Sequence, residues 1–353
     1  MAVQVKQPEK PSAPFSDGLP PNPDTHPKNT MPQPFTFPDY PTVYTQTPKL
    51  SSQYLKYTLR TLLHRRHIRA FETLINSRPE YQALYAKRAQ DAYPLLHAFI
   101  DKRLNAAQRL AAIEYDLAAA VRHFPAATLA RLDTPDTPVP LATLSDGLTL
   151  VLNRNGICTD EGMWALTLTD ENRSRLYTAT FAFTSAGLLA ASVQGPAGSE
   201  AKDTVRRLTK QLHGLRPQQL MTAALQYLAA AFGLPALGIA HSRQAKLRWK
   251  LKKRVKMNYD HFWQESGAAL GSDGHWHLPA EPQRKDIADI ESKKRSMYRK
   301  RYQMLDDLEA ALKTHFQTAC VHSHPIATHC PIKGIKMSKP NLFYCAALAL
   351  LWA

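Results

Sequence analysis

Apolar residues follow two successive spacings along the first two thirds of the chain, one helical and one typical of strands. Over residues 50–122 the apolar side chains recur every three or four positions, as at Leu110, Ile113, Leu117 and Val121. This is the spacing of one face of an α-helix, so we expect this region to be helical. Proline and threonine residues at 134–140 then form a turn or linker that ends it.

Short apolar segments separated by turn residues follow, and they predict strands. They are residues 148–153, 163–169, 175–183 and 188–194. The last two are joined by a short Ser-Ala-Gly link, which predicts a β-hairpin within an antiparallel meander.

The pattern then becomes helical again. Residues 201–212 are amphipathic, and residues 218–232 are apolar on nearly every face, so the second helix should be buried. A short strand at 236–240 and a last helix at 287–316 complete the series. Strands flanked by helices predict an α/β (α+β) fold with a mixed, mainly antiparallel sheet, preceded by a helical region.

Composition divides the chain into three parts. Residues 1–48 hold 12 of the 26 prolines and too little apolar surface to offset their ordering entropy, so we expect them to be disordered. The alternative is that their aromatic residues dock on the body: Phe15, Phe35, Phe37, Tyr40 and Tyr44. One domain is expected over 49–317, with a helical part at 49–133 and an α/β part at 140–317. Residues 318–353 read as an irregular tail.

Cysteine usage and charge indicate the compartment of the protein and the class of its partner. Four cysteines in 353 residues form no disulfide framework, and residues 1–30 show no secretory signal, so we expect a cytoplasmic protein. The formal net charge is +16, and residues 241–302 contribute 16 Lys plus Arg against 7 Asp plus Glu. This excess favours an anionic partner: a phosphorylated ligand, an anionic membrane surface or, less strongly, nucleic acid. The sequence predicts no oligomeric state.

A glycine-containing turn before a helix is the first candidate site. Gln194, Gly195 and Gly198 lie between a predicted strand and a predicted helix, where free N–H groups attract a phosphate. Arg216 precedes a proline at the start of the next helix and could present its guanidinium to the same anion. The alternatives are a tight structural turn and an exposed arginine.

Two basic clusters are candidate anion-binding segments. The first contains Lys250, Lys252, Lys253 and Arg254 among apolar residues, and the second contains Lys293, Lys294, Arg295, Arg299 and Arg301 on a predicted helix. Basic stretches of this kind lie on anionic lipid or follow a phosphate backbone. For the first cluster, the alternative is an ordinary solvated face.

Polar and aromatic residues near these clusters are candidates for a pocket. They are His213, His241, Tyr259, Asp260, Trp263 and Tyr298. A buried Asp260 or its neighbour His261 could transfer protons, although a structural hydrogen bond is the commoner role. The Cys and His residues at 320–330 match no zinc-binding spacing, so no metal is expected, and no specific catalytic motif is present.

Several motifs in register resemble the VirK/YbjX family, a bacterial domain of unknown function. They include Glu161-Gly162, Gln194-Gly195, residues 212–217 (LHGLRP), residues 259–263 (YDHFW) and residues 293–302 (KKRSMYRKRY). The resemblance covers roughly residues 55–317. It implies roles in virulence, resistance to cationic antimicrobial peptides, envelope or lipid A remodelling, and stress or DNA-damage responses. It implies no catalytic residues.

The order of meander, glycine turn, helix and strand is also similar to that of GCN5-related acetyltransferases. Those enzymes hold the coenzyme A pyrophosphate at a Q/R-x-x-G-x-G/A turn. Gln194 matches, but Ala197 stands where a glycine is required. Three hypotheses therefore stay open: a protein that acts on an anionic ligand or surface, peripherally at the inner membrane; an acyltransferase that uses an acyl-CoA; and a nucleic-acid-binding protein of the DNA-damage response.

Overall fold

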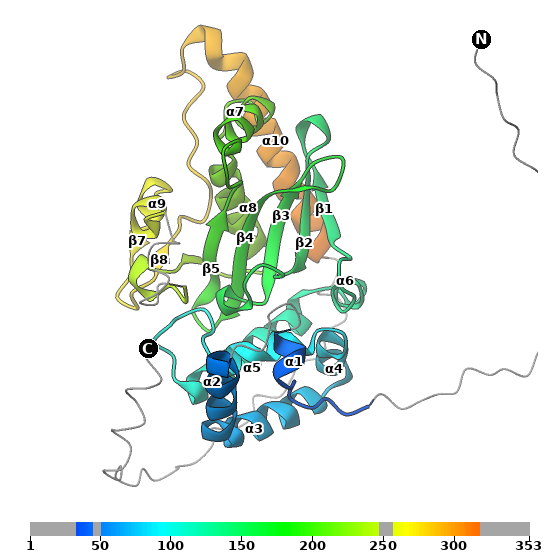
Figure 1. Cartoon of the computed structure of the whole chain (residues 1–353). Helices are drawn as coiled ribbons and strands as arrows, with labels where there is room; N and C mark the ends of the chain where they lie inside the picture. Colours follow the sequence, from blue (N-terminus) through cyan, green and yellow to red (C-terminus); the bar gives the residue numbers. More distant parts are fainter. Residues whose placement is uncertain (1–32, 45–50, 247–256, 318–353) are drawn as a thin grey trace, which may run out of the picture. The chain divides into compact units, whose positions relative to one another are not determined.

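The computed structural model describes residues 33–44, 51–246 and 257–317. The chain divides into two units, residues 1–34 and residues 35–353, and the second unit carries the features below. Figure 1 shows its helices and strands coloured along the sequence.

Helices form the first part of this unit. They are α1 (Tyr40–Val43), α2 (Ser51–Leu63), α3 (Arg65–Asn76), α4 (Pro79–Ala86), the 3-10 helix η1 (Ala89–Leu96), α5 (Ala106–His123) and α6 (Ala126–Leu132). Asn105 starts α5 by accepting a hydrogen bond from the backbone N–H of Gln108, while the Gln108 side chain bonds back to the N–H of Asn105. This capping box satisfies two N–H groups that a helix start would leave free. The predicted helical region is confirmed.

The segment before α2 packs on these helices. Phe35 exchanges hydrogen bonds with the Asn76 side chain and places its ring 5.5 Å from that of Tyr85. Phe37 donates its N–H to Glu72, and the buried Tyr40 lies in α1. The expectation of disorder over 1–48 is therefore corrected for residues 35–44, where aromatic burial outweighs the proline content. The rest of that range, apart from residues 33 and 34, lies outside the described residues.

A mixed sheet follows. Its strands are β1 (Val139–Thr143), β2 (Thr149–Arg154), β3 (Trp164–Thr169), β4 (Arg175–Thr184), β5 (Gly187–Gln194), β6 (Ala236–Gly238), β7 (Ala269–Leu270) and β8 (Trp276–His277). The order is β1-β2-β3-β4-β5-β6-β8-β7, and the β5–β6 pair is parallel while the other pairs are antiparallel. The predicted α+β fold with a mainly antiparallel sheet is confirmed.

Helices cover one face of this sheet. The chain passes from β5 to β6 through α7 (Ala201–Gln211) and α8 (Pro217–Ala231), and α9 (Tyr259–Glu265) and α10 (Ser292–Gln317) come after β6. Figure 1 shows α8 and α10 against the same side of the strands. Side chains alternate along a strand, so the face that meets α8 carries the leucines and the other face carries mostly threonines. The leucine set is Leu150, Leu152, Leu166 and Leu168, all in the main hydrophobic core.

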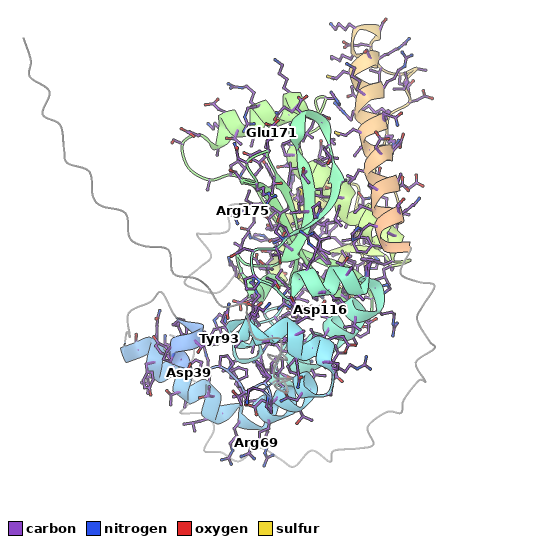
Figure 2. The ribbon with its side chains drawn as sticks, turned by 90° about the vertical axis from the view of Figure 1, so that its right-hand side faces the viewer. Asp39, Arg69, Tyr93, Asp116, Glu171 and Arg175 are labelled. Carbon is purple, nitrogen blue, oxygen red and sulfur yellow. The ribbon has the colours of Figure 1, made fainter. Side chains whose placement is uncertain are left out.

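Asp116 joins the helical part to the sheet. It lies on α5, is fully buried, and its Oδ1 accepts hydrogen bonds from Trp164 Nε1 at 2.9 Å and from Phe183 N at 2.7 Å (Figure 2). Burial raises the pKa of this carboxyl to about 7. A neutral Asp116 therefore bridges α5, β3 and β4 over most of the acidic range.

Candidate functional site

A cavity of about 770 Å³ opens at the start of α8, between α8, α10 and residues 282–285. We call it the α8 pocket. Four cationic side chains and one carboxylate line it: Arg216, Arg284, Lys285, Arg301 and Glu265. The excess of positive charge makes this concave surface attractive to anions.

Arg301 is held rigidly on the wall of the pocket. Its Nε and Nη2 both donate to the backbone oxygen of His213, at 3.1 and 2.9 Å, and its Cζ lies 4.1 Å from the centre of the Tyr298 ring. The turn that presents this oxygen has positive φ at His213 (53°) and at Gly214 (78°). A Cβ at Gly214 would lie 2.7 Å from Arg301 Nη2, so glycine is required for this close approach.

Arg284 is fixed from the other side. Its Nη1 pairs with Asp306 Oδ1 at 2.6 Å, its Nη2 donates to the Tyr227 hydroxyl, and its Cζ lies 5.4 Å from the Tyr302 ring centre. Asp306 therefore neutralises much of the Arg284 charge. Lys285 and Arg216 are exposed cations of the pocket as well.

The N-terminus of α8 adds to the positive potential. Pro217 occupies the first turn, Arg216 is extended (φ −67°, ψ 136°), and no side chain caps the helix. Pro217 has no N–H, and the N–H groups of Gln219 and Leu220 both donate to Arg216 O, so Gln218 keeps the one first-turn N–H without a backbone partner among the described residues. The helix dipole also places positive potential at this end. Arginine charge and helix start therefore favour a phosphate or carboxylate in the same pocket.

The predicted residues divide around this pocket. Arg216, Arg301 and Tyr298 line it. Lys293 and Lys294 pair with Glu291, and the guanidinium of Arg295 bonds to backbone oxygens of its own segment. Arg299 is exposed on α10 and is not among the lining residues. The first basic cluster, Lys250, Lys252, Lys253 and Arg254, lies outside the described residues.

The remaining predicted pocket residues gather around α9. Asp260 Oδ1 accepts from His241 N and from Trp276 Nε1, each at 2.8 Å. Trp263 is fully buried and donates Nε1 to Ile239 O. These contacts are structural hydrogen bonds, the commoner role expected for such residues. The backbone oxygen of His213 accepts from Arg301, and its Nε2 lies 3.2 Å from Ser145 Oγ, but His213 itself is not among the lining residues of the α8 pocket.

Gln194 takes part in a buried network instead of facing a cavity. Its Nε2 donates to Glu161 Oε2 at 2.8 Å, and Ser192 Oγ donates to the same oxygen at 2.9 Å. Burial raises the pKa of Glu161, against the charge of Lys246, which lowers it. The network fixes the end of β5 on the 3-10 helix η3 (Thr159–Glu161).

The glycine turn does not fit a phosphate cradle. A Cβ at Gly195 would lie 2.6 Å from Tyr177 Cζ, so this glycine permits the packing of a tyrosine ring. Glu200 stands at the N-cap of α7 and Asp203 in its first turn, where carboxylates oppose a bound anion. Gly198 has positive φ (94°) and a turn role.

The edge of β5 is also occupied. Ala191 O accepts from Gln244 Nε2 at 2.9 Å, and the Tyr259 hydroxyl bonds to both N and O of Val193 at 3.1 and 3.2 Å. The pairing of β5 with β6 ends at Ala190 and Gly238. Past that point, these side chains already bond to the backbone groups of β5 with which an extended ligand would have to pair. The residues present therefore do not fit an acyl-CoA bound to this turn and strand.

Sequence reasoning missed part of the α8 pocket. Arg284 and Lys285 lie in a Pro- and Gly-rich loop, where no periodicity marks them. Their one signal was the charge excess of residues 241–302. Within the described residues, no group of three or more His, Cys, Asp or Glu side chains could hold a metal ion. The Cys and His residues at 320–330 lie outside that part.

No helix in the described part of the chain combines the length and the apolar character that crossing a membrane requires.

Several bacterial proteins are similar to this chain. An uncharacterized protein of Haemophilus influenzae is 33% identical over 280 residues, which cover 78% of this chain and 96% of that protein. Membrane protein LapB of Mannheimia haemolytica is 36% identical over 194 residues, 54% of this chain and 84% of that protein. The uncharacterized protein YbjX of Escherichia coli is 33% identical over 130 residues, 35% of this chain and 39% of that protein. No solved structure matches.

A family model described as protein of unknown function (DUF535) matches residues 47–314, which contain every described residue of the α8 pocket. The similarity to YbjX agrees with the motifs that the sequence shares with the VirK/YbjX proteins. The chain belongs to the DUF535 family, the VirK/YbjX family.

Proposed function

We propose that the protein binds a phosphate-bearing ligand in the α8 pocket, and that this binding supports envelope integrity, virulence, stress response and resistance to cationic peptides. The observation that carries the proposal is the convergence of Arg216, Lys285 and Arg301 on the uncapped start of α8. Arginine forks and helix N-termini are the usual partners of phosphate oxygens. The rigid seat of Arg301 means that little side-chain entropy is lost when the ligand binds.

The phosphate belongs either to a lipid headgroup or to a free molecule. One relative bears the name Membrane protein LapB, which favours a lipid source for this chain as well. We therefore place the protein in the cytoplasm, peripherally at the inner membrane. Basic residues near an anionic surface contribute to such association in a salt-dependent way.

Co-sedimentation of the full chain with vesicles tests the proposal. We expect binding to vesicles that contain phosphatidylglycerol, loss of binding at high salt, and none to pure phosphatidylcholine. The double variant Arg216→Gln with Lys285→Gln should weaken binding by about tenfold or more, since a charged hydrogen bond contributes about 1.5–3 kcal/mol. Titration with glycerol 3-phosphate separates the sources, because binding of this soluble probe alone indicates a free ligand.

A matched control removes two charges elsewhere. Arg206→Gln with Lys210→Gln changes exposed residues of α7 that do not line the pocket. An equal loss of binding in the control and the pocket variant would mean that general surface charge, and not this pocket, holds the anion. Unchanged binding after the pocket substitutions would also refute the proposal.

The other two hypotheses have less support. The misfit at Gln194–Gly198 predicts that acetyl-CoA and longer acyl-CoAs will not raise the melting temperature, whereas a ligand bound only to the folded state must raise it. Nucleic-acid binding depends on Lys250, Lys252, Lys253 and Arg254, which lie outside the described residues. It stays a prediction, tested by the salt dependence of affinity and its loss when these four are neutralised.

A further inference from the structure

A second cavity, of about 400 Å³, lies on the threonine face of the sheet. We call it the sheet cavity. Its floor comes from alternate residues of β2, β3 and β4, and these include Asn153, Thr167 and Thr178. Because strand side chains alternate, this floor faces away from the leucines that pack under α8. Figure 2 shows Arg175 on the side of the sheet away from α10. No residue lines both cavities.

The floor of the sheet cavity is unusually polar for a buried surface. Thr167 and Thr178 are 6% and 2% exposed, and their hydroxyl oxygens lie 3.3 Å apart. Asn153 Nδ2 donates to Arg154 O, but the buried Asn153 Oδ1 has no hydrogen-bond partner among the described residues. A buried polar atom without a partner costs free energy that a polar ligand could recover.

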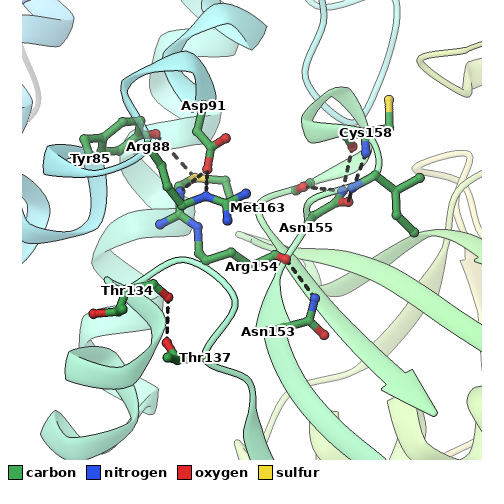
Figure 3. Close-up of polar contacts among 12 residues, drawn as sticks. Tyr85, Arg88, Asp91, Thr134, Thr137, Asn153, Arg154, Asn155, Cys158 and Met163 are labelled. Carbon is green, nitrogen blue, oxygen red and sulfur yellow. Dashed lines mark hydrogen bonds and ion pairs between the residues drawn. The ribbon is translucent and has the colours of Figure 1, made fainter. Parts of the chain in front are cut away.

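Positive charge surrounds this floor. Arg88 is one of the lining residues, and its Nε pairs with Asp91 Oδ2 at 2.9 Å. The same oxygen accepts from Arg154 Nη2 at 2.8 Å, so one carboxylate serves two guanidinium groups (Figure 3). Arg88 and Arg154 are 12% and 3% exposed in their side chains, which leaves a net positive charge shielded from water. Asp91 therefore cannot fully neutralise Arg88.

Two further arginines stand at the rim. Arg173 lies in the turn between β3 and β4, and Arg175 begins β4. Asp136 is the one carboxylate among the described lining residues, against four arginines. Guanidinium groups bind phosphate and carboxylate oxygens with two parallel hydrogen bonds.

We propose that the sheet cavity binds a small hydroxylated anion of the sugar-phosphate class, its phosphate on Arg173 and Arg175 at one end of the floor and its hydroxyls on Thr178, Thr167 and Asn153 along it. The volume lies within the range of about 300–1,000 Å³ that is usual for small-molecule sites. Threonine hydroxyls both donate and accept, as sugar hydroxyls do. No aromatic side chain is among the described lining residues, so a nucleobase finds no ring on which to stack.

Calorimetric titration of the full chain tests this site with four probes: glucose 6-phosphate, glucose, inorganic phosphate and AMP. We expect glucose 6-phosphate to bind at least about tenfold more tightly than each of the others, because glucose and inorganic phosphate each supply only one of the two features and the adenine of AMP finds no aromatic ring among the described lining residues. Arg175→Gln should weaken its binding by about tenfold. Thr167→Val should weaken the binding of glucose 6-phosphate while leaving the binding of inorganic phosphate unchanged.

The controls separate this site from the rest of the surface. Arg206→Gln on α7 should leave binding unchanged, since its side chain is 83% exposed and does not line the cavity. Circular dichroism verifies that each variant folds. If Thr167→Val does not fold, the test depends on Arg175→Gln alone. Three results would each overturn the proposal: no binding of glucose 6-phosphate, AMP bound as tightly as glucose 6-phosphate, or loss of binding through Arg216→Gln instead of Arg175→Gln.

Discussion

Replacing Asp116 by asparagine should remove a specific pH dependence from the stability of the protein. Both hydrogen bonds to Asp116 reach Oδ1, while Oδ2 is buried without a partner among the described residues. An asparagine can accept both bonds with its own Oδ1. Its amide group then takes the place of the protonated oxygen, so the substitution mimics the neutral acid.

The magnitude follows from the pKa of this carboxyl. Burial raises the pKa of Asp116 from 3.8 to about 7, and each unit corresponds to 1.36 kcal/mol, which gives about 4 kcal/mol. Between these two values the folded state holds a proton that the unfolded state has released. The free energy of unfolding therefore falls by about 4 kcal/mol as the pH rises from about 4 to about 7.

Urea denaturation of both proteins across this pH range measures the effect. Other groups titrate in the same interval, so the informative quantity is the difference in free energy of unfolding between wild type and Asp116→Asn at each pH. We expect the variant to gain on the wild type by about 4 kcal/mol from pH 4 to above pH 7. A difference that stays constant with pH would refute the reasoning, because it would show that Asp116 does not titrate with a raised pKa.

Three further predictions concern other positions in the structure. Gly195→Ala should lower the free energy of unfolding, measured by urea denaturation, by about 1–3 kcal/mol, since its Cβ would overlap the Tyr177 ring. An unchanged stability would mean that the turn has space for a ligand after all. Asp91→Asn should cost about 3–5 kcal/mol in the same assay, because it leaves two buried guanidinium groups without a countercharge, and a cost near zero would contradict that pairing. Burial raises the pKa of the Cys158 thiol to about 12, so iodoacetamide at about pH 8 should alkylate it far more slowly in the native than in the urea-unfolded protein. Peptide mapping measures both rates, and equal rates would contradict the burial of the thiol.

The regular elements with strong patterns were predictable. The four central strands and the buried helix α8 follow from alternation and from apolar character on every face, and they agree with the structure within a few residues. β1 was expected to be part of a turn, because Pro140 and its neighbours resemble a linker. It is an edge strand, where a proline is tolerated. The two-residue strands β7 and β8 are too short to produce any alternation.

The sequence predicted some residues of the candidate sites but not how they are arranged. Arg216, Arg301 and Tyr298 were named from a helix start and a basic helix, and the structure places all three on the α8 pocket. Lys293 and Lys294 belong to the same charge run but pair with Glu291. Nothing in a charge count distinguishes a cation that is neutralised by its own segment from one that faces a cavity.

The sequence by itself determined the α+β class, the order of most elements and the sign of the charge, because local periodicity and composition are properties of neighbouring residues. Only the tertiary structure decided where that charge acts. Arg216 and Arg301 are 85 positions apart, and Arg88 and Arg175 are 87 apart. Each pair lines one cavity because the sheet and α8 bring distant segments together. Burial also depends on this packing, and it sets the protonation of Asp116 and the uncompensated charge at Arg88.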